Sequence, residues 1–364
     1  MKCKLSDICS FRKGKVEVEN LNAKNYISTE NMLPNKCGIT EASSLPTVSL
    51  TQEYNSGDVL VSNIRPYFKK IWQAEYDGGC SNDVLVFVPK PNTDKDFLYY
   101  VLADDDFFTY SMATSKGTKM PRGDKTSIMQ YEVPLIDLQV QKKIASVLKA
   151  LDEKIKLNNE INNNLEQQVS ILYQSWFEDF EISNGVCPED WSYQELSSIA
   201  DIASGKRPPV KSNVCNQETP ISIVGAASVM GFTSEANHTD KILVTGRVGT
   251  HGVVQRFNTP CWTSDNTLVI TSPYYEFTNQ ILHRIDYSSM NRGSTQPLIT
   301  QGDMKKVVVL VPDENTLAKF EEFAGSLMAK WEANNKENVK LASLRDTLLP
   351  KLMSGELDVS NIEI

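Results

Sequence analysis

The chain has 364 residues, of which 40% are hydrophobic and 23% are charged, a composition typical of a globular protein with about two or three domains. Its 37 basic and 46 acidic residues give a net charge of −9, which argues against coating of nucleic acid through bulk charge. Local basic patches can still bind DNA. The seven scattered cysteines include no C-x-x-C pair, and the sequence shows neither an apolar leader nor a membrane-spanning run, which favours a cytoplasmic protein.

The first 136 residues indicate a mixed domain of short strands. β-branched runs bounded by Gly, Asn and Pro predict strands at 58–62 and 83–88, and residues 97–111 can form a helix. Residues 137–183 contain no Gly or Pro, and their apolar residues recur at steps of four and three. This heptad pattern predicts a central spacer helix of roughly 60 Å.

The second part of the chain follows the same plan. Residues 184–312 form a second strand-rich domain, with strands expected at 241–245, 267–270 and 307–311. Residues 313–364 are expected to be a second spacer helix and a tail. Its seam is imperfect, because Gly325 lies inside the helix and Arg345 occupies a core position.

The two parts are copies of each other. Gly117, Leu151, Asn158 and Leu165 recur 176 positions later as identical residues, and upstream matches recur at larger offsets. A drifting offset is what loop deletions in the second copy produce, and a period near 180 residues is too long for a solenoid. The sequence therefore predicts two copies of one domain-plus-helix unit. Such a duplicated protein suits a two-fold partner, such as duplex DNA.

Asparagines in the two seams predict how the helices pair. If they run antiparallel with partner numbers summing to 496, Asn158 meets Asn338 and Asn162 meets Asn334. Buried amides fix a register because a slipped register leaves them unpaired. The alternative is a solvated polar waist where the helices splay. The residues assigned to helix pairing are Leu151, Asn158, Asn162, Leu165, Leu172, Leu327, Asn334, Asn338, Leu341 and Leu348.

An antiparallel spacer implies an α+β protein with pseudo-two-fold symmetry, in which two similar recognition domains lie at opposite ends of the helices. Domains held about 60 Å apart could straddle about 15–18 base pairs of DNA.

Catalytic signatures are absent from the sequence. It contains no G-x-G-x-x-G, Walker A, G-x-S-x-G or Asn/Asp-Pro-Pro-aromatic motif, and its three histidines lack metal-ligand spacing. The run Asp104-Asp105-Asp106 is interpreted as a solvated turn or helix end rather than a metal site. No catalytic residue and no metal ligand is therefore assigned.

Local basic patches are the candidate DNA contacts, because base reading and phosphate binding need exposed Arg, Lys, Asn and Gln. The loop 115–125 is the strongest of them, since its cations gain little by packing. Tyr67, Phe68 and Trp72 lie among the basic residues after the first strand, either as core or as base-stacking groups. The candidates are Arg65, Lys69, Lys70, Lys116, Lys119, Arg122, Lys125, Lys206, Arg207, Arg247, Arg292 and Gln296.

Several segments together resemble the specificity (S) subunits of type I restriction-modification systems. SLRDTLLPKLMSGELDVS (343–360) is similar to their C-terminal conserved region, and residues 133–155 with LYQSWF (172–177) are similar to the central one. PEDWSYQELSSIADIASGK (188–206) resembles the start of a target-recognition domain. The resemblance spans nearly the whole chain in the order recognition domain, helix, recognition domain, helix.

The resemblance implies a non-catalytic subunit that selects a bipartite, gapped DNA sequence. Two methyltransferase (M) subunits would dock on the helices and methylate adenine with S-adenosylmethionine, and two restriction (R) subunits could join and cleave DNA with ATP. This chain itself would carry no cofactor. A protein-interaction scaffold, a silent specificity cassette and a self-contained enzyme are the alternatives, the last disfavoured by the motif search.

Overall fold

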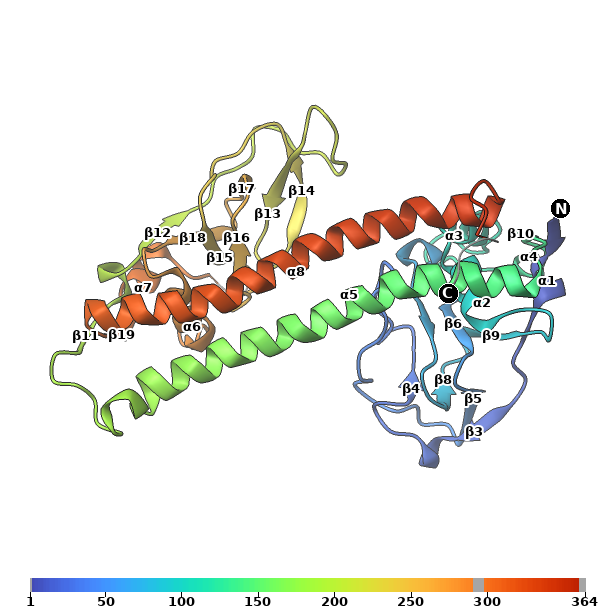
Figure 1. Cartoon of the computed structure of the whole chain (residues 1–364), viewed down its shortest axis with the longest axis horizontal. Coiled ribbons are helices and arrows are strands. Elements are labelled where there is room, and N and C mark those ends of the chain that lie inside the picture. The colour runs from blue at the N-terminus through green and yellow to red at the C-terminus, as the bar shows by residue number, and fades with distance from the viewer. Residues whose placement is uncertain (1, 291–297, 360–364) are drawn as a thin grey trace. The chain divides into compact units, whose positions relative to one another are not determined.

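The computed structural model describes residues 2–290 and 298–359 (Figure 1). By internal contacts the chain divides into two compact units. The first unit comprises Met1–Asn158 and Lys336–Ile364, and the second comprises Asn159–Asn335. Each long helix therefore contributes one part to each unit. Within the described residues, no helix combines the length and apolarity of a membrane span.

Three sheets form the β-structure of the first unit. The central sheet is antiparallel, with strand order β2-β9-β6-β7, and its β6 and β9 confirm the strands expected at 58–62 and 83–88. A second sheet has the order β3-β5-β8-β4, in which β4 and β8 are parallel. The strands are β1 (Lys2–Lys4), β2 (Cys9–Phe11), β3 (Lys15–Glu17), β4 (Tyr26–Ile27), β5 (Leu50–Tyr54), β6 (Val59–Ser62), β7 (Ile71–Gln73), β8 (Gly78–Cys80), β9 (Val84–Pro89) and β10 (Glu132–Pro134).

The single helix expected at 97–111 is wrong, because the chain breaks there into α2 (Lys95–Ala103) and α3 (Asp105–Ala113). Asp104 between them has an extended backbone, and its carboxylate accepts from Asp106 N at 3.2 Å. An aspartate at this position caps the free amides of a helix start. The acidic run therefore lies at a helix terminus, the start of α3, which is one of the two interpretations from the sequence. The short helices are α1 (Leu5–Ile8), α4 (Lys125–Ile128) and the 3-10 turns η1 (Val18–Asn20) and η2 (Pro66–Phe68).

The second unit repeats this plan. Its central sheet has the order β12-β18-β15-β16, which confirms the strands expected at 241–245 and 267–270, and β11 pairs with β19. Among its described residues, no helix stands in the place of α3 between α6 (Tyr275–Arg284) and α7 (Gln301–Lys305). The strands are β11 (Ser192–Glu195), β12 (Asp201–Ser204), β13 (Ile221–Val224), β14 (Val229–Thr233), β15 (Ile242–Gly246), β16 (Gln255–Phe257), β17 (Cys261–Thr263), β18 (Thr267–Thr271) and β19 (Val308–Val311).

The duplication found in the sequence is thus present in the topology. The order β2-β9-β6-β7 matches β12-β18-β15-β16, and β1-β10 matches β11-β19. The second sheet of each unit holds one parallel pair, β4 with β8 and β13 with β17. α5 and α8 begin after equivalent aspartates, since Asp137 Oδ1 accepts from Gln139 N and Asp313 Oδ1 accepts from Thr316 N.

The main core of each unit joins its central sheet to the long helices. In the first unit Phe97 and Leu98 of α2 are fully buried in one cluster with Ile144, Leu148 and Leu352 of the long helices. In the second unit Phe277 of α6 lies in the corresponding cluster with Tyr173, Leu172, Phe320 and Ala324. The helices therefore complete the cores of both units. They are α5 (Leu138–Tyr173), extended by a π-helical turn at Gln174–Glu178, and α8 (Glu314–Ser354).

The asparagine register is confirmed in both units. In the first, Asn158 Nδ2 donates to Asn338 Oδ1 at 2.9 Å and to Glu337 Oε2 at 2.8 Å. In the second, Asn334 Nδ2 donates to Asn162 Oδ1 at 2.9 Å, and Asn158 and Asn334 are each 1% exposed. The four amides are therefore paired, three of them buried and Asn338 half-buried, and the solvated waist is wrong.

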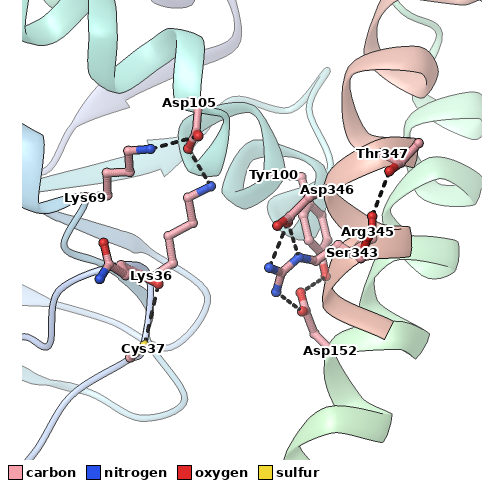
Figure 2. A network of polar contacts seen from close by, with 11 residues as sticks. Lys36, Cys37, Lys69, Tyr100, Asp105, Asp152, Ser343, Arg345, Asp346 and Thr347 are labelled. Atoms are coloured by element: carbon pink, nitrogen blue, oxygen red, sulfur yellow. Dashed lines mark hydrogen bonds and ion pairs between the residues drawn. The ribbon is translucent and has the colours of Figure 1, made fainter. Parts of the chain in front are cut away.

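Arg345, the charged residue in the seam, is held by an ion pair (Figure 2). Its Nη1 lies 2.7 Å from Asp152 Oδ1 on α5, and Tyr100 Oη donates to Asp152 Oδ2 at 2.8 Å. The residue numbers of Asp152 and Arg345 sum to 497, one more than the 496 of the asparagine pairs. The two helices therefore keep the same antiparallel register further along the first unit. The remaining members of the seam set are buried or half-buried.

Candidate nucleic-acid interface

Three backbone segments meet where β6 ends in the first unit. Asn63 N donates to Asp83 O at 2.8 Å, Gly123 N donates to Asn63 O at 3.2 Å, and Arg65 N donates to Pro121 O at 2.8 Å. We call this meeting of residues 62–65, 81–83 and 121–123 the first crossing. It brings the basic patch after β6 against the basic loop 115–125, two candidates that the sequence separates by about fifty residues.

The second unit has an equivalent arrangement at the end of β15. Arg247 N donates to Asn266 O at 2.8 Å, and Ile299 N donates to Arg247 O at 3.0 Å. These bonds repeat those of Asn63, so residues 245–248, 264–266 and 298–299 form the second crossing. The backbone frame is the same in both units, while the side chains that it presents differ.

Lys69 and Lys36 share one carboxylate beside the first crossing (Figure 2). Both ammonium groups lie 2.8 Å from Asp105, at the start of α3. Although burial acts to raise the pKa of Asp105, the two lysines outweigh it and lower that pKa below its ordinary value. Lys70 Nζ donates to Thr29 O at 2.6 Å, and burial lowers the pKa of Lys70. Asp105 therefore holds both lysines beside the first crossing, next to the carboxylates of Asp104 and Asp106.

The basic loop 115–125 is partly neutralised from within. Lys116 lies 2.6 Å from Asp124 and, together with bonds from Ser127, lowers the pKa of that carboxyl to about 2. Arg122 lies 3.1 Å from Asp83, and Lys125 lies over the Phe11 ring at 6.0 Å. Lys119 is exposed, and its side chain has no partner within the described part of the chain. Only Lys119 of these cations could contact DNA without first giving up a partner.

The aromatic residues of the first patch divide into two groups. Trp72 packs edge-on against Tyr54 at 5.8 Å between ring centroids, next to a buried cluster. Tyr67 and Phe68 are 49% and 38% exposed, and their rings lie 4.7 Å apart. Core packing is therefore the right interpretation for Trp72 alone, and the other two rings are available to a partner.

Basic residues also flank the second crossing. Lys206 and Arg207 are exposed after β12, where Lys206 N donates to Thr263 O at 2.9 Å. His251 Nδ1 lies 3.1 Å from Gly246 O, which holds the ring against the loop that carries Arg247. Burial and the charge of Lys206 lower the pKa of His238, so this nearby ring favours its neutral form. The candidates Arg292 and Gln296 lie outside the described residues.

Lys36 is the contributor that the sequence did not reveal. Asn35 N donates to Phe68 O at 2.8 Å and Lys36 N donates to Lys69 O at 2.9 Å, which fastens the loop 34–37 to η2. Pro, Asn and Gly around Lys36 are typical of a turn, yet they do not indicate what the turn contacts. No group of three or more potential metal-ligating side chains occurs in the ranges 2–290 and 298–359.

Comparison with known proteins identifies the kind of chain to which these units are similar. A family model described as the type I restriction modification DNA specificity domain matches twice, over residues 1–167 and 188–336. The MjaIX type I restriction enzyme specificity subunit of Methanocaldococcus jannaschii is 25% identical over 313 residues, covering 76% of this chain and 72% of that protein. The HindI specificity subunit of Haemophilus influenzae is 22% identical and covers 91% of this chain and 94% of its own.

A solved structure supports the same architecture. The crystal structure of the type I restriction-modification S subunit from M. genitalium aligns with a TM-score of 0.60 at 17% identity. The alignment covers 99% of this chain and 96% of that one. At this identity the likeness shows the fold.

Proposed function

Because the chain belongs to the family of type I restriction-modification DNA specificity subunits, we propose that its two units read the two halves of a gapped DNA target. The observation that carries this proposal is the crossing, which repeats one backbone frame in both units and places different side chains on it. One frame with two side-chain sets suits two half-sites of different sequence. Base contacts specify the sequence, and the neighbouring lysines supply phosphate contacts that position the duplex.

The partners in this proposal are two methyltransferase subunits, with restriction subunits joining them, in the cytoplasm. The long helices carry exposed apolar side chains that suit docking of a protein partner, since exposed apolar groups gain free energy when they are covered. Val339 of α8 is 71% exposed and Ile171 of α5 is 65% exposed. The chain would be non-catalytic, with S-adenosylmethionine and ATP bound by the partner subunits.

A methylome comparison tests the proposal. We expect long-read sequencing to find a gapped motif with N6-methyladenine in both halves in cells that carry this gene and its methyltransferase partner. The motif should disappear when this gene alone is deleted, because the partner then has no subunit to direct it. An unchanged methylome would favour the silent cassette or the protein scaffold over DNA reading.

The loop 115–125 gives a second test through salt dependence. Lys116→Ala with Lys119→Ala and Arg122→Ala should weaken binding of the assembled complex to its target duplex. Each lost phosphate contact should reduce the slope of log affinity against log salt by about one. Lys119→Ala alone should reduce this slope by about one. Lys2→Ala serves as the control, since Lys2 is an exposed cation paired with Glu132 on the β1–β10 sheet. Unaltered affinity and slope in the triple variant would remove this loop from the interface.

A further inference from the structure

The arginines of the described residues fall into two groups. Five of them pair with a carboxylate at 3.1 Å or less, and these are Arg12, Arg122, Arg256, Arg284 and Arg345. Within the described residues, the side chains of Arg65, Arg207 and Arg247 have no acidic partner and no hydrogen bond. Arg207 is exposed in a loop, where an unpaired guanidinium is simply solvated. Arg65 and Arg247 are half-buried, so their lack of a partner requires another explanation.

Both half-buried arginines are covered by the protein at one end only. The Nε atom of each is buried without a hydrogen-bond partner, whereas the terminal nitrogens, which also lack partners, are not buried. The terminal nitrogens therefore reach solvent, while the Nε end of the stem is covered by the protein. A buried polar atom without a partner costs free energy, so its persistence calls for a function or a missing partner.

Both residues lie at the crossing of their own unit, next to further unpartnered polar atoms. Asn63 Oδ1 in the first crossing and Ser264 Oγ in the second are also buried without partners, and these residues are 9% and 1% exposed. Arg65 adopts a left-handed backbone with φ of 50°, as do Asn35, Lys36 and Lys69 around it. Such strain collects at binding sites, where the fold holds a side chain in one presentation.

We propose that Arg65 and Arg247 are specificity-determining residues, each reading a guanine in the half-site of its own unit. This inference rests on the proposed function and assigns the base that each crossing reads. The planar guanidinium is the side chain that matches the O6 and N7 acceptors of guanine in the major groove. A stem that is covered at Nε and open to solvent at its terminal nitrogens suits base reading, because burial of Nε limits the directions in which the fork can point.

The surrounding lysines have a different part in the proposal. Asp105 holds Lys36 and Lys69 near Arg65, and their ammonium groups suit contacts with the phosphate backbone. Arg122, in the same crossing, is ion-paired with Asp83 and is therefore not assigned a base. The two crossings present their arginines from different positions. Arg247 occupies the backbone position that Asn63 occupies in the first unit, whereas Arg65 lies two residues after Asn63.

Arginine-to-lysine exchange tests the assignment, since lysine keeps the charge and loses the fork. The methylated motif is first mapped with the wild-type chain, and then with Arg65→Lys, Arg247→Lys and the control Arg284→Lys, each in the full complex. Arg284 is ion-paired with Glu178 and lies outside both crossings. We expect Arg65→Lys to relax one guanine in one half-site, Arg247→Lys to relax one guanine in the other, and Arg284→Lys to leave the motif unchanged. Discrimination at the affected position should fall by about 5- to 150-fold.

A chemical probe gives a readout that needs no variant. The wild-type complex is titrated with duplexes of the mapped motif in which single guanines are replaced by 7-deazaguanine, which lacks the N7 acceptor. One guanine in each half should prove sensitive, and the matching lysine variant should lose that sensitivity. A mapped half-site without guanine, insensitivity to every replacement, or unchanged motifs in both lysine variants would each overturn the assignment. The absence of any motif in the wild type would instead reject the proposed function itself.

Discussion

Replacing Arg256 by alanine should lower the free energy of unfolding of the second unit by about 3–5 kcal/mol. The guanidinium donates to both oxygens of Glu276, at 2.7 and 2.6 Å, and the two side chains are only 10% and 3% exposed. It also lies over the Tyr275 ring at 4.9 Å. Alanine would strand the Glu276 carboxylate inside the unit without a counter-charge, and the protein must then bury that charge or protonate it.

Urea denaturation of the variant chain measures this loss, and two further variants identify its cause. Lys241→Ala is the matched control, because Lys241 lies 3.7 Å from Glu332 and its side chain is 56% exposed. A solvent-screened pair of this kind is worth about 0–1 kcal/mol. Arg256→Met combined with Glu276→Leu should recover most of the stability, since the desolvation of both charges is removed together. The prediction is contradicted when Arg256→Ala loses no more stability than Lys241→Ala.

The elements that the sequence predicted are those with a local signal, either a heptad period or a β-branched run bounded by turn residues. The heptad steps predict both long helices, and the internal repeat predicts that the two units share one plan. The asparagine register was predictable because amides at four seam positions leave one antiparallel pairing that satisfies them all. Arg345 was visible as a defect in the seam, while its compensation by Asp152 was not, because that aspartate lies outside the heptad positions used to find the seam.

The local details of the candidate site were beyond the sequence for two physical reasons. First, the break at Asp104 interrupts an apolar pattern that continues on both sides, and it is marked by a capping bond at the start of α3 and not by a change in the pattern. Second, the loop 34–37 and the loop 115–125 reach the end of β6 through backbone hydrogen bonds, which carry no residue-type signature. The sequence could count the cations of a loop, but it could not indicate that Lys116 and Arg122 already have carboxylate partners.

Replacing the seam asparagines should give a second large effect on thermal stability. Whether stability falls or rises depends on which asparagines are replaced. From the sequence, the paired-amide interpretation predicts that Asn158→Leu with Asn162→Leu would raise thermal stability and loosen the register. The structure predicts the opposite for that pair of substitutions. Both changes fall on α5, and they leave the amide partners on α8 in place, including Asn334 at 1% exposure. Each stranded buried amide costs about 1–3 kcal/mol, so the variant should unfold at a lower temperature than the wild type.

Replacing both members of one asparagine pair distinguishes the effect of losing an amide partner from the effect of a more apolar seam. Asn162→Leu alone should lower the melting temperature, because Asn334 Nδ2 and Asn335 Oδ1 lose the bonds that Asn162 makes at 2.9 and 3.1 Å. Asn162→Leu with Asn334→Leu should recover this loss or exceed wild-type stability, since the buried polar groups are then removed together. A single variant that melts at or above the wild-type temperature would show that these amides are not stabilising partners. If the single variant melts below the wild type and the matched double variant melts at or above it, the asparagines are retained for register. An all-apolar seam can slip by a turn, and a paired-amide seam cannot.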